Sequence, residues 1–474
     1  MGTQVFEKMM EWRGKRVVIV GLARQGLAMA RYLAPKGCQL VLTDRRMDAK
    51  MRELQQSLHN LAKEGNSSIE WVLGDHPVEI LEGADMVFPS GGVSLKLPLL
   101  VEAQARRIPL SNDSQVFLEA APCPVVGITG SAGKTTTTTL VGRIANTGYQ
   151  GGRVWVGGNI GDPLIAYLDE MQRDDLAVME LSSFQLEIMT AAPHIAAVLN
   201  VTPNHLDRHD SMETYTAAKA RILEYQTSTD IAVLGHEDPG AWALAEKVKG
   251  KLYSFGMSDV PDAQSSVYLK GDAVYFRNGE VEAEVMNTDC ISLRGQHNLL
   301  NVLAACSISA AAGLAGEAMR AGVEGFTGVP HRMEFVRTWG GADWYNDSIA
   351  TAPERSMAAI QSFDEPLVLL AGGRDKNLPW EEFAALVRER VDHLILFGEA
   401  AGVISQAIGA PGSDADGWSL SITKCRGLEE AVRAASELVE PGAVVLLSPV
   451  GTSFDEFRDF EERGEAFRQW VLDL

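Results

Sequence analysis

The segment PVVGITGSAGKTTTTT, residues 124–139, constrains the possible folds of this chain more than any other stretch. An apolar β-branched run, a glycine loop and a threonine-led helical pattern follow one another without interruption. Glycines allow backbone N–H groups to approach an anion, and a helix N-terminus adds its positive dipole. Lys134 is placed to contact terminal phosphate oxygens, and Thr135 is placed to offer its hydroxyl to Mg²⁺. The segment therefore predicts a nucleotide-phosphate loop in an α/β domain.

The spacing of this loop is unusual. G-x-x-G-K-T over residues 130–135 is two residues shorter than the general pattern G-x-x-x-x-G-K-[ST]. A shortened loop is typical of a subfamily of nucleotide-binding proteins. Five successive threonines favour a role other than helix stability, because threonine is a mediocre helix former. The alternative, a glycine turn beside a surface lysine, is disfavoured by the flanking strand and helix.

Short β-branched runs alternate with helical patterns along the whole chain, which predicts α/β architecture with mostly parallel sheets. A chain of 474 residues is long enough for several domains. We expect three: a Rossmann-like domain over residues 1–112, a central phosphate-loop domain over 113–329 and a Rossmann-like domain over 330–474. The alternation breaks at VYLKGDAVYFRNGEVEAEV, residues 267–285, where the pair Asn278-Gly279 predicts an antiparallel hairpin.

Composition excludes several classes of protein. A net charge of −21 argues against nonspecific nucleic-acid binding, which requires clustered cations. No run approaches the ~20 apolar residues of a membrane span, and the N-terminal residues lack the apolar core of a secretory signal. Five scattered cysteines without a C-x-x-C pair indicate reduced thiols, with neither a disulfide framework nor a zinc site. We expect a cytoplasmic monomer that binds small molecules and no nucleic acid, without insertion into a membrane.

A second glycine turn follows the first predicted strand. In VGLARQG only Gly21 and Gly26 fit a dinucleotide fingerprint, so G-x-G-x-x-G is incomplete, and Asp44 ends the next strand. A helix N-terminus at this position can still hold a diphosphate. The turn favours a domain that binds a nucleotide-linked substrate over a purely structural turn, and it gives little support to a dehydrogenase.

Three further residues of the central block have side chains suited to catalysis. Glu180 ends an apolar strand, where a phosphate-loop domain needs an oxygen ligand for Mg²⁺, although a helix-capping role is the alternative. His205 lies in the polar loop NVTPNHLDRH, and spacing alone leaves both a structural and a metal-binding role open. Lys219 lies on the following helix, and by itself the pattern predicts a solvated lysine.

Together these segments are similar to the Mur ligases, ATP-dependent enzymes that extend the peptide of the peptidoglycan precursor. The match consists of TGSAGKTT, GGNIG, MELSSFQLE, NVTPNHLDRH, the Ala-Ala-Lys219 helix, GQHNLLN, PHRMEFV, NDSIAT and GGRDKN, in family order across nearly the whole chain. ELSSFQLE, GGNIG and SPVGTSFDEFRDFEERGEAF most resemble members that add D-glutamate to UDP-N-acetylmuramoyl-L-alanine.

The resemblance implies roles for individual residues. Those expected to bind ATP are Gly130, Ser131, Ala132, Gly133, Lys134, Thr135, Thr136, Asn298, Asn301, Arg332 and Asp347. Lys134, His205 and Lys219 are implied to be catalytic, and Thr135, Glu180, His205 and Lys219 to bind two Mg²⁺ ions. Lys219 matches a lysine that the family carbamylates with CO₂, which would make it an anionic oxygen ligand. The sequence pattern alone predicts a solvated Lys219, and only the resemblance assigns this lysine to the active site.

The resemblance also implies two substrate sites. The UDP-linked substrate would contact Gly21, Leu22, Ala23, Thr43, Asp44, Arg45, Gly92 and Asn159, and the incoming glutamate Thr351, Lys376, Ser453 and Phe460. The precursor carboxylate would attack the γ-phosphate of ATP to give an acyl phosphate and ADP. The amine of glutamate would then displace phosphate. Alignment and charge neutralisation would supply most of the catalysis.

Two segments depart from the family pattern. Ile349 in NDSIAT stands where the family often has lysine, and Ser90-Gly91-Gly92-Val93 replaces a serine-proline-glycine turn. A ligase that adds L-glutamate to the same precursor is therefore an alternative, followed by a folylpolyglutamate-synthase-like ligase. A regulatory protein without catalysis would be expected to lack Lys134, Glu180 or Lys219, and all three are present.

Overall fold

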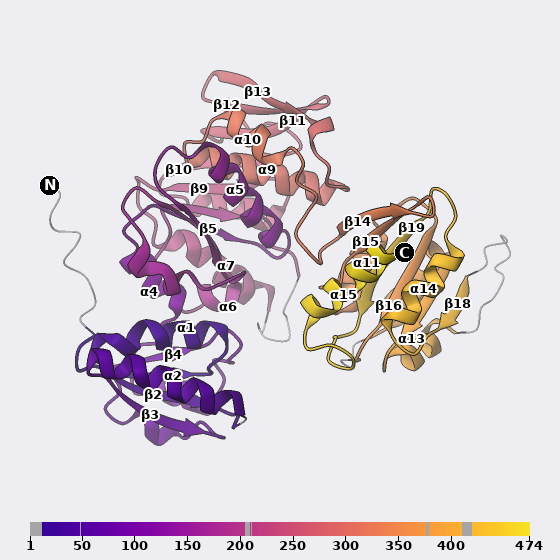
Figure 1. Cartoon of the computed structure of the whole chain (residues 1–474). Helices are drawn as coiled ribbons and strands as arrows, with labels where there is room; N and C mark the ends of the chain where they lie inside the picture. The colour runs from indigo at the N-terminus through magenta and orange to yellow at the C-terminus, as the bar shows by residue number, and fades with distance from the viewer. Residues whose placement is uncertain (1–11, 48, 204–208, 210, 376–378, 410–419) are drawn as a thin grey trace. The chain divides into compact units, whose positions relative to one another are not determined.

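The structure, a computed structural model, describes residues 12–47, 49–203, 209, 211–375, 379–409 and 420–474. The chain forms two compact units (Figure 1). The first consists of Met1–Ser292 with Gln296–Gly325, and the second of Leu293–Gly295 with Phe326–Leu474. The strands of the described residues form three sheets, two in the first unit and one in the second.

The first sheet is parallel, with strand order β3-β2-β1-β4. Its strands are β1 (Arg16–Val20), β2 (Gln39–Asp44), β3 (Ser68–Leu73) and β4 (Met86–Pro89), and its helices α1 (Arg24–Leu33), α2 (Ala49–Gly65) and α3 (Pro98–Ala105). β1 and β2 are almost wholly buried, as expected for parallel strands covered on both faces. This arrangement confirms the predicted Rossmann-like architecture.

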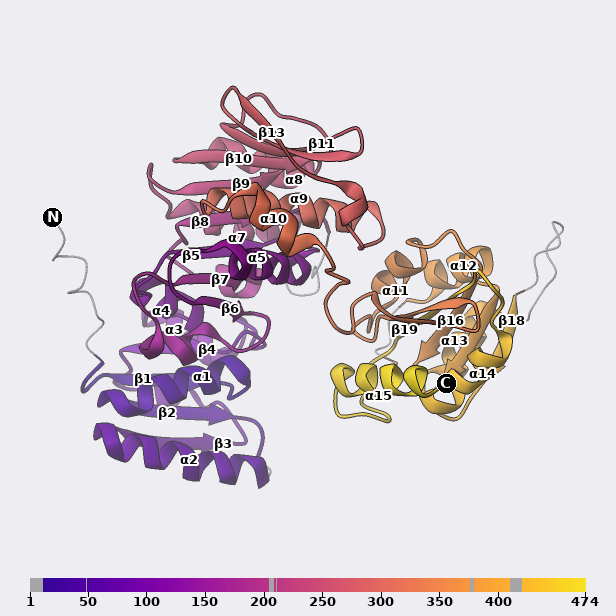
Figure 2. The same ribbon diagram turned by 45° about the horizontal axis from the view of Figure 1, so that its top comes forward.

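The second sheet has strand order β13-β12-β11-β10-β9-β8-β5-β7-β6 (Figure 2). Its parallel strands are β5 (Val125–Thr129), β6 (Val154–Gly158), β7 (Leu176–Glu180), β8 (Ile195–Val198), β9 (Ile231–Gly235), β10 (Lys251–Gly256) and β11 (Ser265–Lys270). β12 (Ala273–Asn278) and β13 (Val281–Asn287) continue it as an antiparallel hairpin. The Asn278-Gly279 prediction is therefore confirmed.

Helices pack against this sheet and join it to the first. They are α4 (Asp113–Ala120), α5 (Lys134–Gly148), α6 (Ser183–Leu186), α7 (Met212–Glu224), α8 (Pro239–Trp242), α9 (Gln296–Ala311) and α10 (Gly316–Val323). Short 3-10 helices occupy Ala34–Lys36, Val78–Leu81, Leu164–Glu170, Ala243–Lys247 and Thr288–Cys290.

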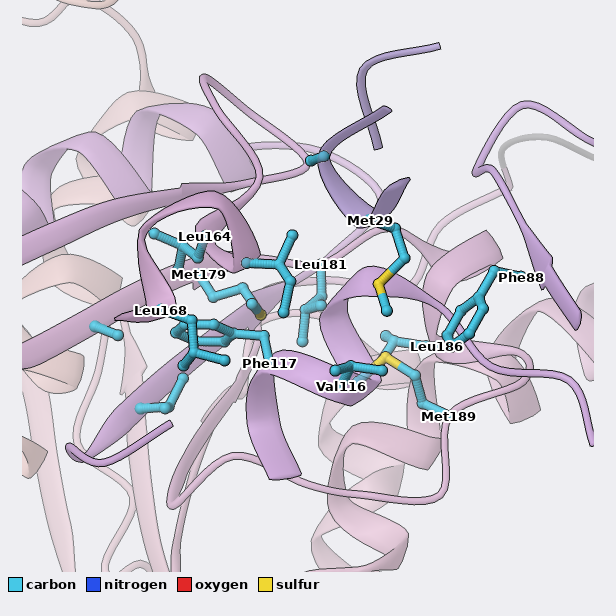
Figure 3. Close-up of a cluster of buried hydrophobic side chains, with 14 of the residues drawn as sticks. Met29, Phe88, Val116, Phe117, Leu164, Leu168, Met179, Leu181, Leu186 and Met189 are labelled. Atoms are coloured by element: carbon cyan, nitrogen blue, oxygen red, sulfur yellow. The ribbon is translucent and has the colours of Figure 1, made fainter. Parts of the chain in front are cut away.

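One apolar core is shared by the first two sheets (Figure 3). It contains Met29 from α1 and Phe88 from β4, together with Phe117 from α4. From the second sheet it contains Met179 and Leu181, which flank Glu180 in the sequence. Close packing makes such a core resist relative displacement of its parts. The first glycine turn and the strand that carries Glu180 therefore belong to one compact unit.

The third sheet forms the second unit, with strand order β14-β15-β19-β16-β17-β18. Its strands are β14 (Glu334–Trp339), β15 (Ala342–Asn346), β16 (Leu367–Gly372), β17 (His393–Phe397), β18 (Ser421–Lys424) and β19 (Val444–Val450). Its helices are α11 (Pro353–Ile360), α12 (Glu381–Arg390), α13 (Ala401–Ile408), α14 (Leu428–Leu438) and α15 (Phe460–Asp473). Apart from the antiparallel pair β14–β15, its strands are parallel.

The three sheets confirm the predicted α/β class with mostly parallel strands. Across the part of the chain that the structure describes, no helix combines the length and apolarity needed to cross a membrane. The division into domains at residues 112 and 329 stays a prediction.

Candidate active site

The phosphate loop connects the end of β5 to the start of α5. Gly133 has φ +80° and precedes Lys134, whose Nζ donates to the Gly130 carbonyl at 2.9 Å. A Cβ atom at position 133 would lie 2.1 Å from Asn301 Oδ1, so this position requires glycine on two counts. Asn200, after β8, braces the loop: its Oδ1 accepts the Ala132 N–H at 2.8 Å. The predicted nucleotide contact Asn301 therefore lies directly against the loop.

Glu180 lies at the carboxyl end of β7, beside the loop. Its side chain is 2% exposed, and its two carboxylate oxygens accept hydrogen bonds from different elements. Oε2 accepts from Thr135 Oγ1 at 2.9 Å, and Oε1 accepts from Asn159 Nδ2 at 2.8 Å. The parallel pairing of β6 with β7 brings Asn159 to this position. Three residues predicted from separate motifs thus converge on one point.

Lys219 is buried in this site. The sequence pattern alone predicted a solvated lysine, and that prediction is wrong, since the side chain is 1% exposed beneath the phosphate loop. Its Nζ donates to the Gly130 carbonyl at 2.8 Å. Burial, followed by the nearby Lys134 charge, lowers the pKa of Lys219 to about 6, against a smaller opposing effect of Glu180. The amine is therefore largely neutral at neutral pH.

Tyr215 is a residue of this site that the sequence motifs did not reveal. Its ring centroid lies 4.7 Å from Lys219 Nζ, and its hydroxyl lies 3.0 Å from Ser131 Oγ in the phosphate loop. Tyr215 thereby connects α7 to the loop. The i, i+4 spacing from Lys219 on a helix was the signal available in the sequence.

Metal binding at this site can be tested by the chemistry of its donors. The hydroxyl of Thr135 and the carboxylate of Glu180 are oxygen donors, which Mg²⁺ prefers. His205 lies outside the described residues. Within the described ranges, no group of three or more His, Cys, Asp or Glu side chains could hold a metal ion. The donors that the structure describes therefore suit an ion that also takes ligands from phosphate and water.

The first glycine turn contacts Asp44 at the end of β2. Asp44 Oδ2 accepts the Leu22 N–H at 2.7 Å and an Nη2–H of Arg46 at 2.8 Å. Burial raises the pKa of Asp44, but the hydrogen bonds from Arg46 and Leu22 outweigh this and lower the pKa to about 2. In dinucleotide-binding folds the corresponding carboxylate holds a ribose. In this chain the carboxylate of Asp44 is bonded by the protein itself, through Arg46, which the motifs missed. Arg45 and Arg46 are both exposed.

The other residues predicted for the UDP-linked substrate surround this turn. Thr43 is buried and donates to the Asp75 carbonyl at 2.9 Å, whereas Ala23 and Gly92 are exposed. Gly91, next to Gly92, donates its N–H to Gln25 Oε1 at 2.9 Å. A cavity of about 120 Å³ lies between the turn after β4 and helix α6; its lining includes Ser90, Gly91, Phe184, Gln185 and His209.

In the second unit, Asp347 follows β15 and is 5% exposed. Its Oδ2 accepts from Ser448 Oγ at 3.1 Å and its Oδ1 from the Met333 N–H at 3.2 Å. Burial raises the pKa of Asp347 to about 7, although Ser448 and the Arg332 charge act in the opposite direction. Met333 and His331 both have positive φ, at 45° and 63°, so Arg332 lies in a tightly turned segment.

Of the residues predicted to bind glutamate, Thr351 and Ser453 follow the carboxyl ends of β15 and β19, and Phe460 begins α15. Arg463, fully buried on α15 and missed by the motifs, connects their loops. It donates to the Ser348 carbonyl at 2.8 Å and to the Gly451 carbonyl at 3.1 Å. These loops continue to Thr351 and Ser453, and Ser348 Oγ donates to the carbonyl of Phe460 at 2.8 Å. Thr351, Ser453 and Phe460 therefore all belong to segments that Arg463 and Ser348 hold together in the second unit.

Ile349 is half-buried, and its N–H donates to the His331 carbonyl at 3.1 Å. Its apolar side chain therefore occupies a partly exposed position that a lysine could also occupy. Lys376 lies outside the described residues.

Replacement of Asp347 by asparagine is expected to stabilise the protein at alkaline pH. Because its folded pKa of about 7 exceeds the unfolded value of ~3.9, the contribution of Asp347 to stability is full below ~pH 4 and is lost as pH rises through 7. At pH 8 the free energy of unfolding of Asp347→Asn should therefore exceed that of wild type by roughly 1–3 kcal/mol, with a higher unfolding temperature, and at pH 4 it should show no advantage. Asp364→Asn, an exposed aspartate of the same unit, serves as the control. Equal shifts at both pH values would contradict a buried acid.

Three family models of known proteins match successive stretches of the chain. The Mur ligase MurD-like N-terminal domain matches residues 15–111, the Mur ligase middle domain residues 128–309, and the Mur ligase glutamate ligase domain residues 331–451. Among solved structures, UDP-N-acetylmuramate-alanine ligase MurC from Thermotoga maritima is 18% identical, with a TM-score of 0.55 over 97% of this chain and 99% of that one. At this identity the similarity demonstrates a shared fold.

Sequence relatives are considerably closer. The UDP-N-acetylmuramoylalanine–D-glutamate ligase of Symbiobacterium thermophilum is 39% identical over 457 residues, 96% of this chain and 98% of the relative. The protein of the same name from Geotalea uraniireducens is 40% identical over 475 residues, 98% of this chain and 99% of the relative. The chain therefore belongs to the Mur ligase family.

Proposed function

We propose that this chain is an ATP-dependent, ADP-forming ligase that adds D-glutamate to UDP-N-acetylmuramoyl-L-alanine in peptidoglycan precursor synthesis. The observation that carries the proposal is the convergence of Lys134, Glu180 and the buried Lys219 on one phosphate loop. Relatives that carry this activity in their names align over nearly their whole length. We further propose that the enzyme acts in the cytoplasm as a monomer.

The phosphate loop supplies the site for ATP. Its backbone N–H groups and Lys134 bind the phosphates, and Asn301 and Asn298 extend the site along α9. We also propose Arg332 and Asp347 as nucleotide contacts, on the resemblance to the family. Attack by the precursor carboxylate on the γ-phosphate forms an acyl phosphate and releases ADP. The glutamate amine then attacks the acyl carbon, and the tetrahedral intermediate expels phosphate.

Thr135 and Glu180 would hold magnesium through oxygen, together with His205 and a carbamate on Lys219. When bound, the metal neutralises charge on the transferring phosphoryl group. Lys219 fits this role because its amine, held neutral by burial, retains the lone pair that attacks CO₂. The new N–C bond converts a potential cation into an anion and releases a proton. Lys134 remains the charge that faces the phosphates.

Thr351, Lys376, Ser453 and Phe460 would surround the incoming glutamate. Hydroxyl and ammonium groups suit its two carboxylates. Near Thr351, Ile349 replaces the lysine that the family often has. This departure leaves a ligase that adds L-glutamate as the second candidate. The names of the relatives favour the D-enantiomer.

The substrate can be tested directly. Purified protein receives ATP, Mg²⁺, UDP-N-acetylmuramoyl-L-alanine and one glutamate enantiomer, and phosphate release and product mass are measured. Turnover is expected with D-glutamate alone and requires the precursor. Turnover with L-glutamate alone would replace the proposed amino acid. Failure with both enantiomers, combined with activity on a folate acceptor, would replace the substrate class.

A further inference from the structure

We propose that Arg24 is a positioning residue, which links the first glycine turn to the Glu180 carboxylate through Asn159. The inference rests on the proposed function, since it assigns Glu180 to the catalytic site. Arg24 is the first residue of α1, and its Nη2 donates to the backbone carbonyl of Asn159 at 2.6 Å. The two residues are 135 positions apart in the sequence, and this bond joins the first sheet to the second.

The position of Arg24 in its helix is electrostatically unfavourable. The N-terminal end of a helix carries partial positive charge and favours acidic side chains in the first turn. α1 has no acidic residue there, and its N-cap residue Ala23 makes no side-chain capping bond. An arginine at this position therefore does not serve helix stability. The bond to Asn159 gives the charge a function outside the helix.

Helix α1, which begins at Arg24, also packs against α4 at the junction of the two sheets. Asp113 begins α4, the helix that joins them, and is 5% exposed. Burial raises the pKa of Asp113 to about 6, and the charge of Arg24 opposes part of this rise. The helix that carries Arg24 thus contacts α4, and Arg24 itself bonds to the Asn159 loop.

Asn159 transmits its position to Glu180 through two bonds. Its backbone N–H donates to the Glu180 carbonyl at 2.9 Å, and its Nδ2 donates to Glu180 Oε1 at 2.8 Å. The preceding Gly158 has φ +103°, and a Cβ atom there would lie 2.5 Å from the Glu180 carbonyl oxygen. The Asn159 peptide is thus packed closely on the strand end. A shift of this peptide would move the side-chain bond that orients the carboxylate.

The adjacent residue extends the link toward the nucleotide-linked substrate. Gln25 accepts the Gly91 N–H at 2.9 Å and so holds the turn after β4. Asn159 and Gly92 are both predicted to contact the UDP-linked substrate. Arg24 bonds to Asn159, and Gln25 bonds to Gly91 beside Gly92, so these two residues connect the first glycine turn to both predicted contacts. Because the two sheets share one core (Figure 3), the Arg24 bond lies within one compact unit.

The test begins with Arg24→Gln. It is expected to lower kcat about tenfold, the value of roughly one charge-assisted hydrogen bond, and to raise the Mg²⁺ concentration for half-maximal activity. KM for D-glutamate should stay unchanged, since the residues proposed to bind it belong to the other unit. Arg24→Lys retains a donor and should recover part of the loss. Arg31→Gln, an exposed arginine in the last turn of the same helix, is the matched control.

A double-mutant cycle identifies the route. If Arg24 acts through Asn159, Arg24→Gln should change kcat less than about twofold in an Asn159→Ala background, because coupled residues are not additive. A full tenfold loss in that background would overturn the proposal. So would an Arg24→Gln protein with the kcat and Mg²⁺ dependence of wild type. Thermal unfolding verifies that each variant is folded.

Equilibrium binding separates this proposal from the proposed function. Calorimetric titration with ADP and Mg²⁺, without acceptor or glutamate, should show weaker Mg²⁺-dependent nucleotide binding for Arg24→Gln and the wild-type value for Arg31→Gln. This comparison does not depend on which acceptor the enzyme uses. Wild-type failure in the substrate assay with a clear Arg24 effect on binding would refute only the substrate. Normal turnover by wild type with unchanged Arg24→Gln binding and kinetics would refute only the positioning role.

Discussion

Lys219→Ala is expected to lower ligase turnover about 10³-fold or more, and added acetate or formate is expected to restore part of it. The wild-type amine is buried beneath the phosphate loop, 2.8 Å from the Gly130 carbonyl, where a cation would oppose the binding of metal ions. The carbamate would supply negative charge at this position. Truncation leaves room in which a small carboxylate can place its oxygens.

The measurement is initial rate against carboxylate concentration, with product mass as confirmation. Gly130 keeps a hydrogen bond in the variant because Lys134 Nζ also donates to its carbonyl, at 2.9 Å. The control is Lys251→Ala, which removes an exposed lysine at the start of β10 in the second sheet. This variant should retain full activity without added carboxylate. Full activity of unrescued Lys219→Ala would exclude the carbamate role. An inactive, folded variant that no carboxylate rescues would assign Lys219 a structural role instead.

Glu180→Gln is expected to lower turnover about 10²- to 10³-fold and to raise the requirement for Mg²⁺. The substitution keeps the shape of the side chain and removes its charge. Both carboxylate oxygens accept hydrogen bonds, from Thr135 and from Asn159, and an amide can accept with only one of its two terminal atoms. One of the two donors therefore loses its acceptor, and the metal loses an anionic ligand.

Rates measured over a wide range of Mg²⁺ concentration separate these effects, and thermal unfolding checks the fold. Partial recovery at high Mg²⁺ is expected. Glu170→Gln, at the exposed end of the 3-10 helix Leu164–Glu170, removes only a surface ion pair with Arg153 and should behave as wild type. Wild-type Mg²⁺ dependence in Glu180→Gln would show that this carboxylate is not a metal ligand.

The sequence by itself determined the elements whose signals are local. The β5–loop–α5 segment was predictable because a β-branched run, positive-φ glycine and Lys134 lie next to one another in the chain. The hairpin at Asn278 was predictable for the same reason, since a two-residue turn fixes its register. The hairpin of β14 and β15 was not predicted, although Gly340 and Gly341 form its turn with positive φ at both residues. Its strands lack a regular alternation of apolar and polar side chains.

The site was determined by the sequence only in part. Lys134 could be predicted because it follows a glycine loop and begins a helix, and Glu180 because it ends a recognisable strand. Lys219 was not, because the pattern of α7 contains no information about the loop that covers it. The resemblance to a family supplied its candidate role, and the tertiary structure supplied its burial.

Only the tertiary structure revealed Arg24, Arg46, Tyr215 and Arg463. Each acts through a backbone carbonyl or another side chain, and the partners of Arg24 and Arg463 lie up to 135 residues away in the sequence. A hydrogen bond to a carbonyl carries no requirement on the identity of the residue that accepts it, so it leaves no motif at the acceptor. Local sequence therefore determines where strands end and loops begin, while packing between distant strands determines which arginine, tyrosine or lysine reaches them.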